Sequence, residues 1–222
     1  YTGTALTNFC QLPVSSDADK VYNQVNTIML DRYDVVTSAP LGFNNTYVMS
    51  VRPEFAREHN LTKLSDLLAA SDELNLGCTA EFLQRNDCLP GMEEKYGTEF
   101  KSVKALDASI RYQAVANGEV DVIDAFATDG LLKKLELQPL PDDLSFFPPF
   151  YAVSFTRAQV LEENPELRDI FAKLDGQISD EEMRSLNYAV DVDGRDPHTV
   201  AHEFLVSKGL LQSVSYTHLR AP

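Results

Sequence analysis

Beyond Leu41, short apolar runs alternate along the chain with amphipathic segments. Apolar runs bounded by Gly, Asn, Asp or Pro favour buried strands, and apolar positions at helical spacing favour helices. The predicted strands cover residues 46–51, 74–78, 100–105, 120–125 and 152–155. The predicted helices between them cover residues 62–70 (with Thr62 as N-cap), 80–85 and 108–117, with a turn over 86–91. Strands separated by helices of this length favour parallel βαβ units, whose ligands bind at the carboxyl ends of the strands.

Both flanks of this alternating region are predicted to be helical. An early amphipathic helix covers residues 19–33, and a later one covers 161–174. Ser179-Asp-Glu-Glu182 is a capping box that opens the next helix. Asp196-Pro197 opens the last one, with Asp as N-cap and Pro at the first helical position, and Gly209 ends it.

The length of 222 residues allows one large domain or two small lobes. Residues 47–52 and 151–157 flank the middle block and are expected to cross between two lobes. A hydrophobic content of 44% with 24% charged residues is ordinary for a globular protein. No run of the sequence approaches the ~20 apolar residues that a membrane-spanning helix requires.

The formal net charge of −15 argues against a nucleic-acid partner, because phosphate binding needs clustered Lys and Arg, and the sequence has no such cluster. The charge does not by itself identify a cationic ligand, since most acidic side chains lie on solvated faces.

Cysteine and histidine give little evidence of a bridge or a metal site. Cys78 and Cys88 are close enough in sequence to pair and would leave Cys10 over, but three buried or free thiols are favoured, because the spacing is not of the disulfide or zinc type. His198 and His202 stand four residues apart on a helix without the Glu of a zinc-protease motif, so solvated histidines are expected and no metal is predicted.

Catalytic chemistry is poorly supported as well. The sequence has no Gly-x-Ser-x-Gly motif, no cysteine with a convincing histidine partner, and no phosphate-binding Gly-rich loop. Asp121, Asp124 and Asp129 could form a carboxylate cluster for acid–base work, although a polar network at a strand end with a turn cap is favoured. Residues 191–196 resemble a calcium loop only faintly and are interpreted as a polar turn. No catalytic residue and no cofactor are predicted.

The aromatic residues gather at turns rather than along helix faces. Four sets each lie where an apolar run ends, and they cover residues 1–4, 43–47, 124–130 and 146–151. Rings at strand ends can converge on one cavity, and a pocket walled by rings suits a diffuse quaternary ammonium cation. Asn44, Asn45 and Thr46 supply polar groups beside these rings, and Arg85 could clamp a carboxylate at the other end of a zwitterion.

Several short motifs follow one another from Tyr1 to about Leu211. They are Tyr1-Thr-Gly-Thr-Ala-Leu6, Gly42-Phe-Asn-Asn-Thr-Tyr47, Glu81-Phe-x-x-Arg85, Thr128-Asp-Gly130, Phe147-Pro-Pro149, Leu186-Asn187 and Val190-Asp191. In order and spacing, these motifs resemble the glycine betaine/choline/carnitine substrate-binding proteins of osmoprotectant ABC importers.

The resemblance implies a type II, two-lobed periplasmic-binding-protein-like α/β fold with parallel sheets, flanking helices and two crossing hinge strands. Residues 1–48 are expected in lobe 1, 49–151 in lobe 2, and 152–212 in the return to lobe 1 with the C-terminal helices. It further implies a non-enzymatic, extracytoplasmic protein that passes glycine betaine, choline or carnitine to an ABC permease served by a cytoplasmic ATPase. A lipid anchor or fusion to the permease would hold it at the membrane.

The resemblance also implies ligand-binding residues. Tyr1 and Tyr47 match aromatic cage positions, Thr4 matches a hydroxyl near the ligand carboxylate, and Arg85 matches the carboxylate-binding arginine. Asn45 belongs to the same predicted set. Phe126 and Phe150 occupy aromatic positions where the family often has Tyr. Phe keeps the ring face but lacks the phenol oxygen.

Two alternatives have the same fold: an enzyme that uses the Asp121, Asp124 and Asp129 carboxylates, and a sensor domain that binds the same solutes. The family pattern also leads us to expect an initial βαβ segment ahead of Tyr1. Residues 213–222 lie beyond the family pattern and have no helical or strand period, so they are expected to be a non-native tail.

Overall fold

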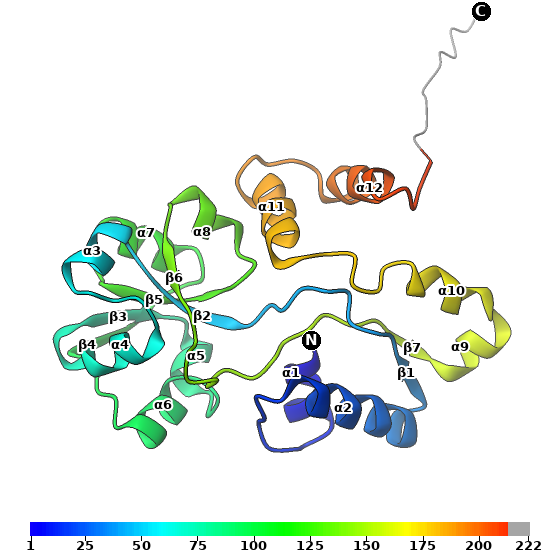
Figure 1. The fold of residues 1–222 in the computed structure, drawn as a ribbon, viewed down its shortest axis with the longest axis horizontal. Coiled ribbons are helices and arrows are strands. Elements are labelled where there is room, and N and C mark those ends of the chain that lie inside the picture. The colour runs from blue at the N-terminus through cyan, green and yellow to red at the C-terminus, as the bar shows by residue number, and fades with distance from the viewer. Residues whose placement is uncertain (213–222) are drawn as a thin grey trace, which may run out of the picture.

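Two lobes lie along the long axis of the molecule, and two extended segments cross between them (Figure 1). The computed structural model describes residues 1–212, so the predicted tail lies outside the described residues. No helix among residues 1–212 has the length and apolar character needed to cross a membrane.

The larger lobe is built on one mixed five-stranded sheet. Its strands are β2 (Tyr47–Val51), β3 (Asn75–Cys78), β4 (Ser102–Ala105), β5 (Val122–Phe126) and β6 (Gln138–Leu140), in the order β4-β3-β5-β2-β6. β3 is parallel to β4 and β5, as predicted, but β2 is antiparallel to β5 and β6. The all-parallel expectation is wrong at this edge because the chain enters the lobe through β2 in the opposite direction.

Helices cover both faces of this sheet. They are α3 (Pro53–Glu58), α4 (Leu64–Ala69), α5 (Ala80–Gln84), α6 (Leu89–Tyr96), α7 (Ile110–Ala116) and α8 (Gly130–Lys134). Alternate residues of a strand point to opposite faces, so Val122 of β5 packs into one core and Ile123 and Ala125 into the other. The lobe therefore has a separate apolar core on each side of its sheet.

The smaller lobe contains α1 (Thr2–Thr4), a π-helical turn η1 (Ala5–Phe9) and α2 (Ala18–Tyr33). Strand β1 (Val35–Thr37) pairs antiparallel with β7 (Phe155–Arg157), which leads into α9 (Ala158–Glu163) and α10 (Glu166–Ala172). Its main core packs the π-helical turn against α2 through Leu6, Val21 and Val25.

The two crossing segments run side by side between the lobes. Asn44 and Tyr151 form a bridge, and the backbone N–H of Asn45 donates to the carbonyl of Phe150. The first crossing thus precedes the predicted residues 47–52, because residues 47–51 form β2 in the sheet of the larger lobe and Arg52 begins α3 as its N-cap. The predicted place of this crossing is therefore wrong. Along both segments, the backbone is paired as a two-stranded ribbon.

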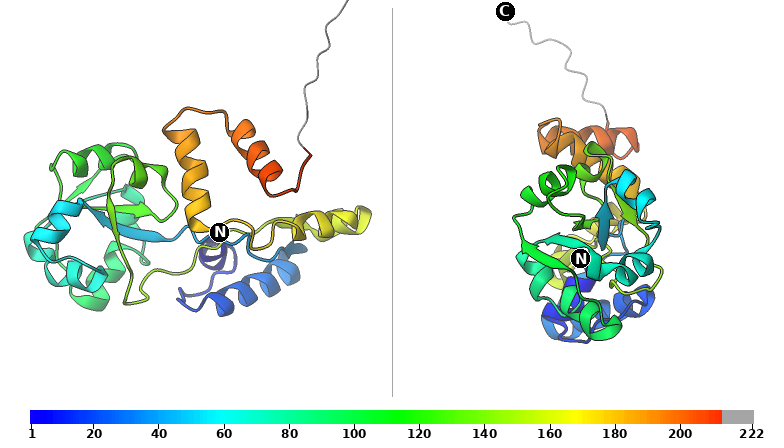
Figure 2. Two further views of the ribbon diagram at one scale, coloured as in Figure 1. Left: turned by 45° about the horizontal axis from the view of Figure 1, so that its top comes forward. Right: turned by 90° about the vertical axis from the view of Figure 1, so that its left-hand side faces the viewer.

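Helix α11 (Asp180–Asp191) stands beside α8 of the larger lobe and is followed by α12 (Pro197–Ser207) (Figure 2). The capping box of Ser179 and Glu182 opens α11, and the Asp196 side chain caps α12, as predicted. The Asp180 carboxylate also accepts from the N–H of Asn44, which ties the start of α11 to the first crossing.

Some local predictions are wrong for identifiable reasons. Pro165, which has no N–H, separates α9 from α10 where one helix was predicted over 161–174. The turn expected over 86–91 instead leads into α6, because Pro90 lies in the first turn, where a missing N–H costs nothing. Thr62 bonds to Asp66 rather than capping α4. The strand expected at 152–155 forms at Phe155–Arg157.

Gly130 determines how closely α8 approaches α11. A Cβ added there would lie 2.7 Å from both N and Cα of Tyr188, which are backbone atoms that cannot rotate away. We expect Gly130→Ala to lower the free energy of unfolding by about 1–3 kcal/mol through this overpacking. Denaturant unfolding will measure the loss, with Lys134→Ala, an exposed position of the same helix, as control. Equal stability of the two variants would contradict the close packing.

Candidate functional site

A cavity of about 510 Å³ opens in the larger lobe where three parallel strands end. Its wall includes Thr79 and Glu81 after β3, Ala108 and Ser109 after β4, and Phe126 and Asp129 at the end of β5. Arg111, Tyr112 and, from α11, Asp191 also line it. Carboxyl ends of parallel strands are where open α/β sheets bind their ligands, so the location matches the sequence-based expectation.

The floor of the cavity rests on a buried ion pair. Asp124 has no exposed surface, and its carboxylate accepts from the N–H and the hydroxyl of Thr79, both at 3.0 Å. Arg111, only 2% exposed, lies 3.5 Å from that carboxylate and donates to the carbonyls of Asp124 and Ala108. Burial raises the pKa of Asp124, and the charge of Arg111 opposes that rise.

Asp129 stands above this pair with its carboxylate partly exposed. It accepts from the Phe126 N–H at 3.1 Å and from the Tyr112 hydroxyl, and it lies 3.7 Å from Arg111. Asp121 faces the amino end of the strand instead, where it accepts from Asn75. Asp124 and Asp129 thus share Arg111 in a polar network at the strand end, as favoured, and Asp121 lies at the opposite end of the strand and does not join them.

The turn that carries Asp129 is held from two directions. The Thr128 hydroxyl donates to Oδ1 of Asn45 at 2.6 Å, and Asn45 belongs to the first crossing segment. From α11, Arg184 donates twice to the Ala127 carbonyl and Asn187 donates to the Thr128 carbonyl. One wall of the cavity is thereby coupled to a crossing segment and to α11.

Among the predicted aromatic residues, Phe126 lines this cavity and Tyr47 lies behind it. Tyr47 is 2% exposed, and its ring is surrounded by Phe82, Phe126, Phe147 and Phe150 at centroid distances of 4.7–6.0 Å. Burial is the main cause of the raised pKa of its hydroxyl. Tyr47 is thus a core residue that supports the ring of Phe126.

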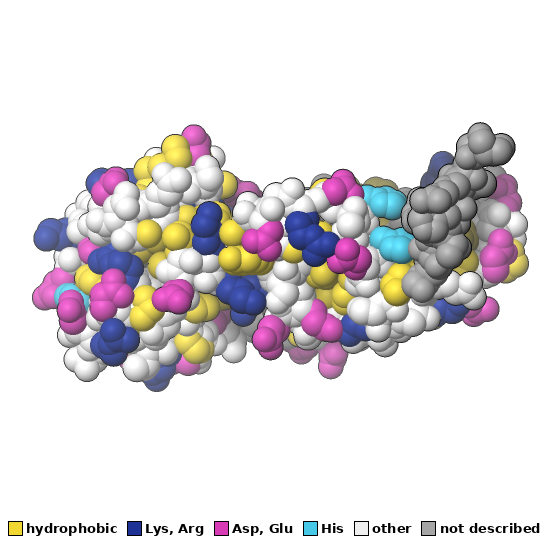
Figure 3. Space-filling view, turned by 90° about the horizontal axis from the view of Figure 1, so that it is seen from above, with side chains coloured by type: hydrophobic (Ala, Val, Ile, Leu, Met, Phe, Trp, Pro, Cys, Tyr) yellow, Lys and Arg dark blue, Asp and Glu magenta, His cyan; other side chains and the backbone are white. Residues whose placement is uncertain are grey.

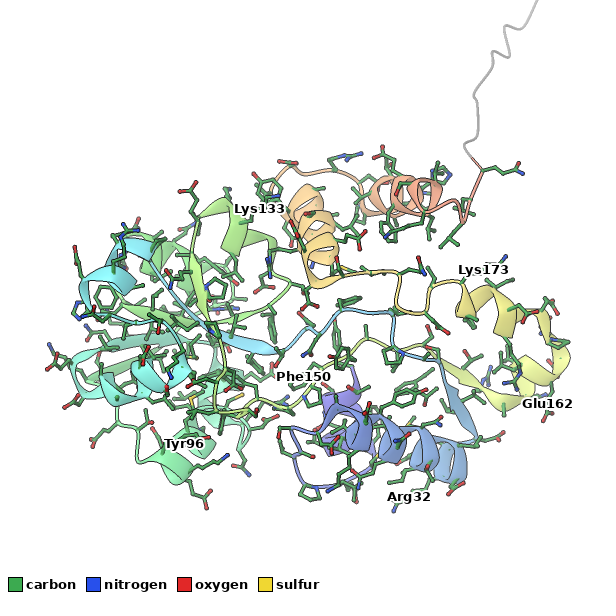
Figure 4. The ribbon with its side chains drawn as sticks, in the orientation of Figure 1. Arg32, Tyr96, Lys133, Phe150, Glu162 and Lys173 are labelled. Atoms are coloured by element: carbon green, nitrogen blue, oxygen red, sulfur yellow. The ribbon has the colours of Figure 1, made fainter. Side chains whose placement is uncertain are left out.

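Phe150 lies at the junction of the lobes, on the second crossing segment (Figure 4). It is buried, packs close to Gly3 of α1, and has the Arg85 guanidinium 5.9 Å from its ring centroid. Its ring therefore touches both lobes without lining the cavity.

From the smaller lobe, Tyr1 approaches the turn that carries Asp129. Tyr1 is 48% exposed and packs edge-on against Phe43. Partial burial raises the pKa of its hydroxyl, a hydrogen bond with Asn45 lowers it, and the charge of Asp129 raises it. Thr4, half-buried, ends α1, and its carbonyl accepts from Thr7.

Arg85 is already engaged by protein carboxylates. Nε and one terminal nitrogen donate to Asp87 at 2.8 and 2.6 Å, and the other terminal nitrogen donates to Glu81 at 2.9 Å. The hydrogen bonding to Asp87 is the largest cause of the raised pKa of this guanidinium. All three nitrogens therefore have an anionic partner within the protein.

Sequence reasoning gave no ligand role to Arg111, Tyr112, Ser109 or Asp191, although the structure places all four on the cavity wall. Arg111, Tyr112 and Ser109 belong to the helix predicted over 108–117, and the position of this helix next to the strand ends was the missed signal. Cys10, Cys78 and Cys88 are buried and free, as favoured. His198 is exposed and His202 half-buried, and residues 1–212 contain no cluster of three or more potential metal ligands.

Two lobes, two paired crossings and a cavity at strand carboxyl ends define the class of type II periplasmic binding proteins. The chain belongs to the OpuAC family, the substrate-binding domain of ABC-type glycine betaine transport systems, whose profile matches residues 1–207. The fold class expected from the sequence is confirmed.

Individual relatives support this membership. The chain is 33% identical over 210 residues to the ergothioneine transport permease/ergothioneine binding protein EgtU of Helicobacter pylori (strain G27), covering 95% of this chain and 38% of that protein. It is 34% identical over 206 residues to the carnitine transport binding protein OpuCC of Listeria monocytogenes, covering 92% of this chain and 67% of that protein. A crystal structure described as a glycine betaine/carnitine/choline ABC transporter superposes with a TM-score of 0.86 at 33% identity, over 95% of this chain and 77% of the other.

The enclosure of Tyr47 gives a stability test. Tyr47→Ala should lower the free energy of unfolding by about 3–5 kcal/mol, because it leaves a cavity among four phenylalanine rings. Tyr47→Phe keeps the ring and should cost far less. Chemical denaturation of both variants will measure the difference, and near-equal losses would show that the hydroxyl, not the ring, matters.

Proposed function

We propose that this chain captures a quaternary ammonium compound (glycine betaine, choline or carnitine) in the cavity at the ends of β3, β4 and β5. The observation that carries the proposal is the pairing of the Phe126 ring with the partly exposed Asp129 carboxylate on one cavity wall. A ring face and an anion together suit a soft cation, and the volume lies within the usual range for small-molecule sites.

Each predicted residue has a role in this proposal. Phe126 offers a ring to the ligand from the larger lobe, and Tyr1 offers one from the smaller lobe. Tyr47 and Phe150 hold these walls in place. Asn45 and Thr4 are the polar groups at the junction, with Asn45 fixing the turn at Thr128. Arg85 holds the Glu81 side chain at the cavity rim.

Lobe closure would complete the site. With the segments before the first crossing and after the second assigned to one lobe, and the segment between them, from β2 onward, to the other, bending of the paired crossings would bring Tyr1 towards Phe126 and exclude water. Exclusion of water strengthens the electrostatic contacts to the cation. Contacts of α11 with both Asn44 and the 127–130 turn suggest that this helix takes part in the movement.

The expected partners follow from family membership. We propose that the chain acts outside the cytoplasm and hands its ligand to an ABC permease driven by a cytoplasmic ATPase. It is held at the membrane by a lipid anchor or by fusion, and the Helicobacter pylori relative is described as permease and binding protein together. On the face shown in Figure 3, acidic and basic side chains are interspersed, consistent with a small-molecule ligand rather than nucleic acid.

Function as a binding protein rather than an enzyme agrees with the engagement of Asp124 and Asp129 by Arg111 and with the remote position of Asp121. A thermal-shift screen with glycine betaine, choline and L-carnitine tests binding directly, because a ligand that binds only the folded protein raises its melting temperature. No shift with any of the three at millimolar concentration would contradict the proposal.

Phe126 is the residue whose loss should affect binding most directly. Phe126→Ala should make the binding free energy of each quaternary ammonium compound less favourable by about 1–2 kcal/mol, since it removes a ring face from the cavity wall. Isothermal titration calorimetry will measure the change. Phe155→Ala, an exposed phenylalanine on β7 in the smaller lobe, is the matched control. Equal affinity of the two variants would remove Phe126 from the site.

A further inference from the structure

The accessible charges on the cavity wall are all negative. Glu81 is 60% exposed, the Asp129 side chain is 29% exposed, and Asp191 is exposed at the end of α11. The wall contains one cation, Arg111, which is 2% exposed. Its nitrogens are directed at the carbonyls of Asp124 and Ala108 and at the carboxylates of Asp124 and Asp129.

The neighbouring cations Arg85, Arg184 and Lys133 do not line this cavity. Arg85 is held by Asp87 and Glu81, as described above. Arg184 directs its guanidinium to the Ala127 carbonyl, and the Lys133 ammonium lies 5.7 Å from the ring centroid of Tyr188. Pairing Arg111 with Asp124 and Arg85 with Asp87 leaves the carboxylates of Glu81, Asp129 and Asp191 as the excess charge.

A ligand carboxylate would meet unfavourable electrostatics here. A zwitterion places its own anion within a few ångströms of its ammonium group, and in this cavity that anion faces like charges on a wall without an exposed guanidinium. Like charges brought together in a water-excluded site discriminate strongly between otherwise similar ligands. A cation without a carboxylate meets only attraction.

We propose that the preferred ligand is a quaternary ammonium compound with net positive charge and no carboxylate, of the choline type, selected by Asp129 and Asp191. This inference rests on the proposed function and narrows its ligand class. The relatives described for carnitine and glycine betaine transport have zwitterionic ligands in their names, so the inference separates this chain from them.

Calorimetric titration of the wild-type chain with choline, glycine betaine, L-carnitine and 3,3-dimethylbutan-1-ol tests the ligand class. The last compound is an uncharged carbon analogue of choline that keeps its shape and hydroxyl. Choline should bind at least about tenfold more tightly than each of the other three. The comparison with betaine isolates the carboxylate, and the comparison with the alcohol isolates the positive charge.

Charge-neutralising variants test the residues. Asp129→Asn and Asp191→Asn should each weaken choline several-fold and reduce the ratio of choline to betaine affinity. Because the Asp191 side chain is exposed, Asp191→Asn should leave the fold intact. It therefore tests the inference even if Asp129→Asn disturbs the turn. Asp72→Asn is the matched control, because it removes the same charge ahead of β3, at the end of the strand opposite the cavity.

The outcomes separate this inference from the proposed function. Betaine or carnitine binding as tightly as choline overturns the inference and leaves the proposed function standing. Choline selectivity that is unchanged in both Asp129→Asn and Asp191→Asn overturns the assignment to these carboxylates. Absence of binding by all three quaternary compounds overturns both proposals.

Discussion

The buried ion pair between Arg111 and Asp124 is the interaction on which the cavity depends. It joins the end of β5 to α7, and through the N–H and hydroxyl of Thr79 it also joins the start of α5. Separating such a pair leaves an uncompensated charge in the interior, at a cost on the order of 3–5 kcal/mol. The three loops that follow the parallel strands are therefore held in one arrangement, and the ligand would meet a preformed wall rather than independent loops.

A chain of hydrogen bonds connects this ion pair to the first crossing segment between the lobes. Asp129 is directed by Arg111, Tyr112 and the Phe126 N–H, and the turn before it is bonded to Asn45 of the first crossing. The same turn accepts hydrogen bonds from α11. A ligand that draws Asp129 inward would act on a crossing segment and on α11 at once, because backbone carbonyls and a short side-chain bond connect them. This continuity gives a physical basis for coupling between ligand occupancy and lobe closure.

The sequence predicted the class of fold, the positions of most strands and helices, and the strand ends where the cavity lies. The sequence-based prediction was wrong where the pairing of strands distant in sequence determines the position of a side chain. The antiparallel register that places Tyr47 opposite Phe126 puts both rings in one aromatic cluster, with Tyr47 behind and Phe126 in front. A turn-associated aromatic pattern does not distinguish these two positions. The local errors at Pro90 and Pro165 have a similar origin, since proline begins one helix and separates two others according to where it falls in the turn.

The charge of the cavity likewise depends on the arrangement of charged side chains and not on the composition of the chain. The net charge of −15 describes the whole surface and says nothing of any one cavity. From the sequence, an arginine near a predicted site is interpreted as a carboxylate clamp. In the structure, Arg85 donates to Asp87 and Glu81, and Arg111 donates to the backbone carbonyls of Asp124 and Ala108. Both guanidinium groups are therefore used for contacts within the protein, and the carboxylates around them outnumber them. The selectivity of the site is therefore set by this surplus of negative charge, to which Glu81, Asp129 and Asp191 contribute on the cavity wall.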